Sequence, residues 1–292
     1  MSQALAEPGN LAVSAPGYAQ PDLPCRASTV AAYRDAVAQA IALMYARFAE
    51  PLSLQDMAAA AALSPYHFNR VFRSITGITP CQFLCAIRLK AAMHLLLTTP
   101  LSVTDVCFEV GYNSLGTFTT RFTQLIGVPP TQLRDVVHTA LPMLELLASQ
   151  REQLAHAASP EGGIRGRVIA PESASGWIFV GLFPTAIPQG CPLGCTLLPV
   201  PGVYQINLPP NGRYYVFAAA FPLSADPLSY LMPDAASLKV GVSQSPISIC
   251  GNRVDGHPDI ALRAVRLTDP PILPALPLLL ADHRTHFEMA LT

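Results

Sequence analysis

The fold of this chain is decided by LSLQDMA at residues 52–58 and by LSVTDVC at residues 101–107, two copies of one pattern placed forty-nine residues apart. The repeat continues downstream at a spacing of fifty, where Phe68, Phe72, Gly77 and Pro80 correspond to Phe118, Phe122, Gly127 and Pro130. Repetition of this kind is the signature of a duplicated supersecondary unit. We therefore expect two copies of one small helical motif within this stretch.

Each copy has the residues that a helix-turn-helix needs. A serine, Ser53 or Ser102, stands where it can cap a short apolar helix, and a turn then precedes a second helix. In the second helix of the first copy, Phe68 and Phe72 lie four residues apart, so both can be buried on one side. Polar and basic groups occupy its other sides. Such groups read base edges in a major groove, because Asn pairs with adenine and Arg pairs with guanine or phosphate.

The candidate DNA-contacting residues lie in and just before these two second helices. They are Ser64, Tyr66, His67, Asn69, Arg70 and Arg73 in the first copy, and Ser114, Leu115, Gly116, Thr117, Thr120 and Arg121 in the second. The second set contains fewer long polar side chains. We therefore expect the first helix to contribute more to base recognition.

Charge supports a nucleic-acid partner only locally. Lys and Arg number 18 against 19 Asp and Glu, so the net charge of −1 gives no indication of such a partner. Residues 57–104, however, contain no carboxylate, whereas Arg70, Arg73, Arg88 and Lys90 fall within them. This distribution predicts a positive patch of the kind that phosphate binding requires. The alternative is that a segment of this length lacks acidic residues by chance, because charged residues are few in this chain.

A family resemblance covers most of the repeat. Residues 64–134 read SPYHFNRVFRSITGITPCQFLCAIRLKAAMHLLLTTPLSVTDVCFEVGYNSLGTFTTRFTQLIGVPPTQLR, and they resemble the AraC/XylS DNA-binding domain. The matching positions include Ser64, Phe68, Arg70, Phe72, Gly77, Pro80, Arg88, Ala91, Leu96, Val106, Gly111, Phe118, Phe122, Gly127, Pro130 and Arg134. The resemblance implies seven helices, with a long helix from Pro80 to Thr98 between two helix-turn-helix units and two recognition helices in successive major grooves. Thr120 and Thr123 depart from the family, which more often has basic residues there.

The chain changes character after this helical half, because short β-branched and aromatic runs punctuated by Pro and Gly follow residue 165. We expect a multidomain protein, in which an all-α double helix-turn-helix domain of seven helices is followed by a small all-β sandwich. The expected boundaries are 1–28 for a flexible leader, 29–139 for the DNA-binding domain, 140–160 for a helical connector, 161–280 for the β-sandwich and 281–292 for a tail.

One element of the second half resembles a known motif. Between two apolar runs, residues 208–212 read LPPNG, and this sequence predicts a tight turn in which Gly212 takes a positive φ. The pattern resembles a hairpin of transthyretin-like and carboxypeptidase-regulatory-like β-sandwiches, which are usually noncatalytic modules. The resemblance therefore implies a fold and no particular ligand.

The role of this second half remains open between a sensor for a small-molecule effector and a dimerisation or protein-contact module. A ligand pocket needs apolar walls with a few polar groups, and Trp177, Tyr204 and Tyr215 either line one or belong to an ordinary core. Cys191, Cys195 and Cys250 either bind zinc or form a redox disulfide, or they have no such role.

The sequence contains no Ser-His-Asp order, phosphate-binding glycine loop or carboxylate pair, so we expect no enzyme, no cofactor and no metal. Seven irregularly spaced cysteines and the absence of a signal-peptide pattern favour the cytoplasm, and prolines interrupt the apolar residues 270–281, so no membrane span is expected. The expected function is a sequence-specific transcription regulator that binds double-stranded DNA, with activator as the candidate mode and repression left open. Further candidate partners are an effector, RNA polymerase and a second copy of the chain. The alternative is a noncatalytic interaction protein with weak or architectural DNA binding.

Overall fold

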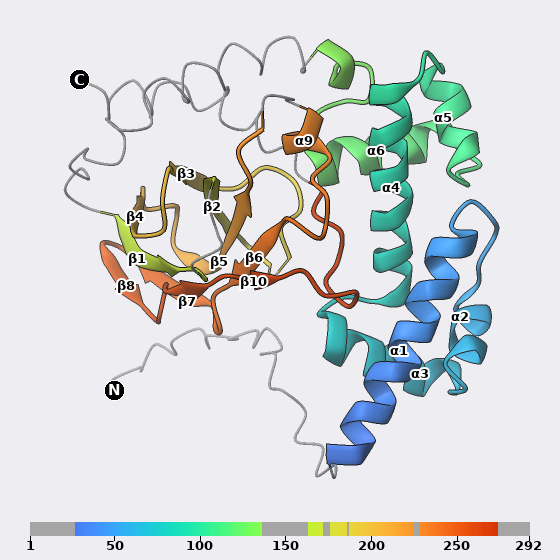
Figure 1. Cartoon of the computed structure of the whole chain (residues 1–292), viewed down its shortest axis with the longest axis horizontal. Helices are drawn as coiled ribbons and strands as arrows, with labels where there is room; N and C mark the ends of the chain where they lie inside the picture. The colour runs from blue at the N-terminus through green and yellow to red at the C-terminus, as the bar shows by residue number, and fades with distance from the viewer. Residues whose placement is uncertain (1–26, 136–162, 172–175, 186, 225–227, 274–292) are drawn as a thin grey trace, which may run out of the picture.

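The computed structural model describes residues 27–135, 163–171, 176–185, 187–224 and 228–273 (Figure 1). A helical half and a β-rich region lie side by side, which confirms the multidomain organisation (Figure 1). The helices of the first half are α1 (Ala27–Arg47), α2 (Leu54–Ala60), α3 (Pro65–Thr76), α4 (Pro80–Thr98), α5 (Val103–Glu109) and α6 (Leu115–Ile126). Helical backbone begins again at Leu133. The expected connector at 140–160 and tail at 281–292, like most of the leader, lie outside the described residues.

Reciprocal caps fix where the helices begin. The Ser53 hydroxyl accepts a bond from the Asp56 backbone N–H, and the Asp56 carboxylate accepts one from the Ser53 backbone. Ser102 and Asp105 form the same box at the start of α5, and Thr79 and Gln82 form it at the start of α4. These bonds satisfy backbone N–H groups that have no partner within the first turn of a helix.

We predict that Ser102→Ala lowers the free energy of unfolding by about 1 kcal/mol, because α5 loses a cap bond and the Asp105 carboxylate loses the hydroxyl that donates to it at 2.6 Å. Urea denaturation followed by circular dichroism measures the change. Thr104→Ala, at an exposed position of the same helix, is the control and should stay within about 0.5 kcal/mol of the parent. An equal loss in both variants would show that the cap has no special role.

Two hydrophobic cores share α4. Phe68, Phe72 and Phe83 are fully buried in the first core, which joins α1, α2, α3 and the first half of α4. Phe118 and Phe122 are fully buried in the second core with the other half of α4. Of the described helices, α4 alone is long and apolar enough to cross a membrane by length and composition. Its place in two cores accounts for that composition.

The β-rich region contains two sheets. The strands are β1 (Ile164–Ile169), β2 (Trp177–Phe183), β3 (Gly194–Leu198), β4 (Val203–Ile206), β5 (Gly212–Phe221), β6 (Lys239–Val242), β7 (Ile247–Cys250), β8 (Arg253–Asp255), β9 (Ile260–Ala261) and β10 (Arg263–Ala264), with the short helix α9 (Leu228–Leu231) between β5 and β6. The smaller sheet has the order β4-β1-β9, and the larger has the order β10-β6-β5-β2-β3, with β7 pairing β5 and β8. Successive side chains of β2 alternate between a core shared by the two sheets and a core on the other face of the larger sheet.

The expected hairpin at residues 208–212 is wrong. β4 pairs with β1, whereas β5 pairs with β2, β6 and β7, so the LPPNG segment passes from one sheet to the other. Gly212 does not take a positive φ and is the first residue of β5. A Cβ on Gly212 would lie 2.7 Å from the Tyr214 hydroxyl oxygen, which donates to the Pro210 carbonyl at 2.8 Å. Gly212 is therefore needed for close approach of a tyrosine ring and not for a turn.

The two halves share their cores. Ile187, in the loop between β2 and β3, is buried in the first helical core, and Leu231 of α9 and Leu273 are buried in the second. The Gly190 N–H in the same loop donates to the Leu125 carbonyl of α6 at 2.9 Å. The β-rich region thus contacts both helix-turn-helix units.

Candidate nucleic-acid interface

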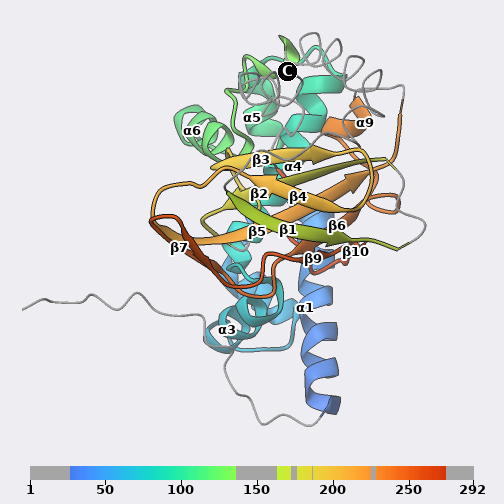
Figure 2. The ribbon, with the colours of Figure 1, turned by 90° about the vertical axis from the view of Figure 1, so that its left-hand side faces the viewer.

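Helices α3 and α6 lie toward the same side of α4 (Figure 2). Each follows a serine, but the two serines differ. The Ser114 hydroxyl accepts a bond from the Thr117 backbone, whereas the Ser64 side chain makes no cap bond. The Ser64 hydroxyl thus remains available to an external acceptor at the start of the first recognition helix.

The exposed side of α3 carries the groups expected from the sequence. Phe68 and Phe72 face the core, while Tyr66 is 84% exposed, Arg70 is exposed and Asn69 is half-buried. The outward groups can donate hydrogen bonds to bases and phosphates. The structure therefore places Tyr66, Asn69, Arg70 and Arg73 on the side of α3 away from Phe68 and Phe72, whereas His67 is half-buried and Ser64 precedes the helix.

A tyrosine that the sequence did not single out holds His67. Tyr33 of α1 places its hydroxyl 3.2 Å from His67 Nε2, and an Arg70 Nη2 lies 3.5 Å from His67 Nδ1. A guanidinium can only donate, so Nδ1 accepts from Arg70, which leaves Nε2–H to donate to Tyr33. The contact chain from α1 thus restricts the Arg70 side chain before any DNA binds. The contact between Tyr33 and His67 could not be predicted from local sequence patterns, because 34 residues separate the two side chains.

The face of α6 is less polar. Leu115 is 40% exposed, and Gly116, Thr117 and Thr120 are also exposed. The Thr123 hydroxyl donates to the Thr119 carbonyl of its own helix at 2.9 Å, so its proton is not available to DNA. Arg121 is the charged side chain of α6. This face offers apolar contact and one cation.

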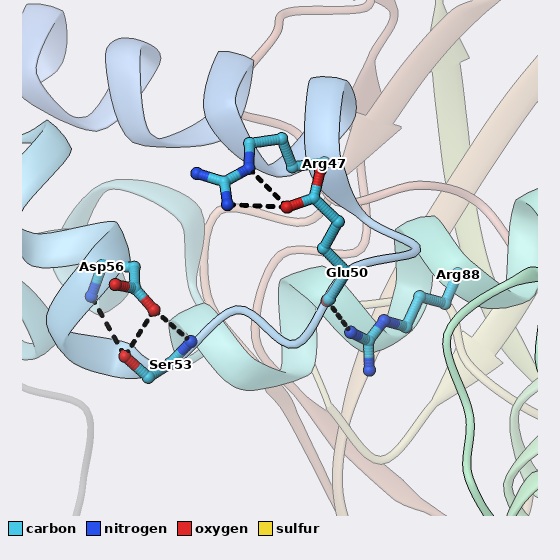
Figure 3. Close-up of polar contacts among 5 residues, drawn as sticks. All are labelled: Arg47, Glu50, Ser53, Asp56 and Arg88. Atoms are coloured by element: carbon cyan, nitrogen blue, oxygen red, sulfur yellow. Dashed lines mark hydrogen bonds and ion pairs between the residues drawn. The ribbon is translucent and has the colours of Figure 1, made fainter.

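The single positive patch expected over residues 57–104 is wrong. Arg88 donates from Nε to the Phe48 carbonyl at 2.7 Å. It also donates from Nη2 to the Glu50 carbonyl at 2.8 Å (Figure 3), and the two bonds hold the loop between α1 and α2. Lys90 is half-buried near Asp234 of the β-rich region, and this burial lowers the pKa of its ammonium group. Only Arg70 and Arg73 remain on the exposed side of α3, because sequence proximity on α4 does not place Arg88 and Lys90 on the same surface.

Arg88 has a structural counterpart in the second unit. Arg134 donates from Nε to the Leu96 carbonyl at 2.9 Å and from Nη2 to the Thr99 and Leu101 carbonyls. Each arginine thus ties down the loop that precedes the first helix of its own helix-turn-helix unit. The duplication extends to these polar contacts.

Comparison with known proteins gives the family. A helix-turn-helix domain family matches residues 57–135. The HTH-type transcriptional activator AarP of Providencia stuartii is 32% identical over 96 residues, which are 32% of this chain and 71% of AarP. The chain belongs to the AraC type of helix-turn-helix, DNA-binding transcription regulators.

Other known proteins are similar to part of this AraC-type regulator. The bifunctional transcriptional activator and DNA repair enzyme AdaA of Bacillus subtilis is 33% identical over 89 residues, which cover 30% of this chain and 42% of AdaA. The chain thus spans less than half the length of AdaA. The C-terminal domain of the response regulator AraT from Geobacillus stearothermophilus is a similar solved structure, with 31% identity, 34% of this chain and 84% of that chain covered, and a TM-score of 0.33.

The three aromatic residues expected to line a ligand pocket of this AraC-type regulator do not converge. Trp177 is buried on one face of the larger sheet, whereas Tyr204 is buried between the sheets and donates its hydroxyl proton to the Pro258 carbonyl. Tyr215 alone lines a cavity, which lies between the larger sheet and the helical half. Trp177 and Tyr204 are core residues because the alternation along their strands points them inward.

The cysteines do not form a metal site in the described residues, where no three His, Cys, Asp or Glu side chains are grouped to hold an ion. No disulfide joins Cys191, Cys195 and Cys250. Burial, with a smaller contribution from Cys191, raises the pKa of the Cys195 thiol to about 12. A thiol with so high a pKa is a poor nucleophile at neutral pH.

Proposed function

We propose that this AraC-type regulator activates transcription by inserting α3 and α6 into successive major grooves of one duplex. The main observation in support of this proposal is that two equivalent exposed helices, α3 and α6, lie on the same side of α4. A 19-residue helix spans about 28 Å at 1.5 Å per residue, which approaches the pitch of about 34 Å of one DNA turn. Activation is proposed because AarP and AdaA are named as transcriptional activators.

The base-reading groups in this proposal are unequal. Asn69, Arg70 and Arg73 supply amide and guanidinium donors to the first groove, with Ser64, Tyr66 and His67 beside them. In the second groove, Ser114, Thr117, Thr120 and Arg121 contact the backbone, and Leu115 and Gly116 lie against base edges or thymine methyl groups. The first helix therefore supplies most of the sequence preference.

The β-rich region is proposed as a noncatalytic sandwich of the transthyretin-like kind, within boundaries of 161–280, that modulates DNA binding. Two sheets enclosing one core support this proposal, as does the Tyr214 hydroxyl bonded to the Pro210 carbonyl, a corner found in sandwich folds. The contacts of Ile187 and Gly190 with the helical half support a route for modulation. An effector, RNA polymerase and a second copy of the chain remain proposed partners.

Selection of bound sequences from random duplex DNA tests the function, followed by measurements on Arg70→Ala. We predict that this variant binds the selected site about 10- to 100-fold more weakly, since one bidentate base contact contributes about 1 to 3 kcal/mol. Arg121→Ala should lose less, because α6 presents fewer polar groups.

Arg253→Ala, at an exposed position in β8, is the control and should bind as the parent does. Circular dichroism establishes that each variant is folded. Unchanged DNA binding in folded Arg70→Ala would contradict the groove assignment. A parent chain that enriches no sequence would favour the alternative of an interaction protein with architectural DNA binding.

A further inference from the structure

A cavity of about 1500 Å³ separates the end of α3 and the start of α4 from the larger sheet. Residues 73–78 and the loop residues 184, 185 and 187–189 form part of its wall, so the cavity reaches the last turn of the first recognition helix. Its volume exceeds the roughly 300 to 1,000 Å³ of pockets that hold small organic ligands. There is thus room for such a ligand at the junction of the two halves.

The floor of this cavity is apolar. Phe217, Leu238 and Val240 of the β-rich region line it and are almost fully buried. Ile78 and Ile187 line it from the helical half and from the β2–β3 loop. These side chains can contact an apolar ligand body from both halves.

The charged groups around the cavity are almost all basic. Arg73, Lys90, Arg213, Arg263 and Arg266 line it together with one carboxylate, Asp269, although the whole chain has slightly more acidic than basic residues. Asp269 is already occupied, because both of its oxygens accept from Arg263 at 2.7 and 2.8 Å. The excess of positive charge therefore has no acidic counterpart within the described cavity lining.

Two of these arginines have no side-chain partner. The Arg213 and Arg266 side chains make no hydrogen bond or ion pair with any described residue. Lys90 is half-buried, and this burial, opposed by the nearby Asp234 carboxylate, lowers the pKa of its ammonium group. Arg213 and Arg266 are exposed, so their guanidinium groups can donate to an anion from solvent.

We propose that this cavity binds an amphipathic organic anion, with its apolar body on the Phe217 floor and its carboxylate or phosphate against Lys90 and Arg266. Binding of the anion to this cavity does not depend on DNA. Its consequence for DNA rests on the proposed function, because the ligand would contact the last turn of α3 beside Arg73.

The chain contains only two lysines, and this makes a direct test available. Lys90 lines the cavity, whereas Lys239 of β6 does not and holds its ammonium group against the Ala236 carbonyl at 3.3 Å. Acylation of the full chain with acetic anhydride, read by mass spectrometry, reports both amines in one sample. Lys239 is therefore an internal reference for Lys90.

We expect 2-naphthoate or 2-naphthyl phosphate to slow acylation of Lys90 at least 10-fold at saturation and to leave Lys239 unchanged. The probe that protects Lys90 from acylation shows whether the cavity binds a carboxylate or a phosphate. Neutral 2-naphthalenemethanol, which has the same ring system, should protect at least 10-fold more weakly. Arg266→Glu should raise the half-protecting concentration at least 10-fold, whereas Arg253→Glu, outside the cavity lining, should not.

Absence of protection by both anions would overturn the proposal, as would equal protection by the neutral probe or an equal effect of Arg253→Glu. Protection of Lys90 by the selected duplex DNA, but by neither naphthyl anion, would also overturn it and assign these charges to phosphate contacts. The footprint requires no DNA, and the selection of bound sequences requires no ligand. Failure of the ligand site is therefore distinguishable from failure of the proposed function.

Discussion

Gly111→Ala is expected to lower the free energy of unfolding by about 3 kcal/mol. Gly111 has a φ of +82°, and a Cβ there would lie 2.5 Å from the Ala49 carbonyl oxygen. The left-handed conformation costs an alanine about 1 to 2 kcal/mol, and the clash adds about 1 to 3 kcal/mol because a backbone atom must move. Urea denaturation monitored by circular dichroism measures the loss.

The same substitution should also weaken DNA binding. Ala49 belongs to the loop between α1 and α2, whereas Gly111 belongs to the turn of the second helix-turn-helix. The added methyl group therefore pushes the two units apart and changes the spacing of α3 and α6. We expect binding of the selected DNA site to fall even under conditions where the variant is fully folded.

The repeat provides matched controls. Ala62 occupies the position equivalent to Gly111 and has a φ of +52°, but it is exposed, so Ala62→Gly should stabilise the protein by about 0.5 to 1 kcal/mol. Gly77 has the same φ as Gly111 with no atom within 4 Å of its added Cβ, so Gly77→Ala should lose about 1 kcal/mol. Equal losses for Gly77→Ala and Gly111→Ala would exclude the Ala49 contact as the cause.

Local signals account for what the sequence predicted correctly. Ser53 and Ser102 cap helices through neighbours three residues away, and Pro80 marks the first turn of α4. Phe68 and Phe72 are buried because a spacing of four places both on one helix face. Such features depend on residues within about one helical turn, so a sequence alone reveals them.

Features that depend on distant residues were not predictable in this way. LPPNG has the composition of a turn, but the partners of β4 and β5 are set by strands elsewhere in the chain. The basic residues of α4 were expected on one surface with those of α3, yet Arg88 and Lys90 face different neighbours. The cavity likewise combines α3, α4 and β5, which only the packing of the two halves brings together.

Arg88 illustrates how a basic residue in a DNA-binding domain can act on structure alone. Arg88→Ala is expected to lower the free energy of unfolding by about 2 to 3 kcal/mol, because the Phe48 and Glu50 carbonyls lose charge-assisted hydrogen bonds. The loop that these carbonyls anchor leads directly to the Ser53 cap of α2 (Figure 3). Urea denaturation measures the loss.

Arg88→Lys separates this clamp from a phosphate contact. Lysine keeps the charge but lacks the planar fork that reaches two carbonyls at once, so we expect its stability to fall nearly as far as that of Arg88→Ala. Both variants should retain the parent's salt dependence of DNA binding, measured where they are folded. Loss of one neutralised phosphate would instead reduce the slope of log affinity against log salt by about 0.9 in Arg88→Ala and leave Arg88→Lys unchanged. If Arg88→Lys had nearly the stability of the parent and Arg88→Ala showed the reduced slope, the charge alone would account for the role of Arg88. That result would show that Arg88 contacts DNA.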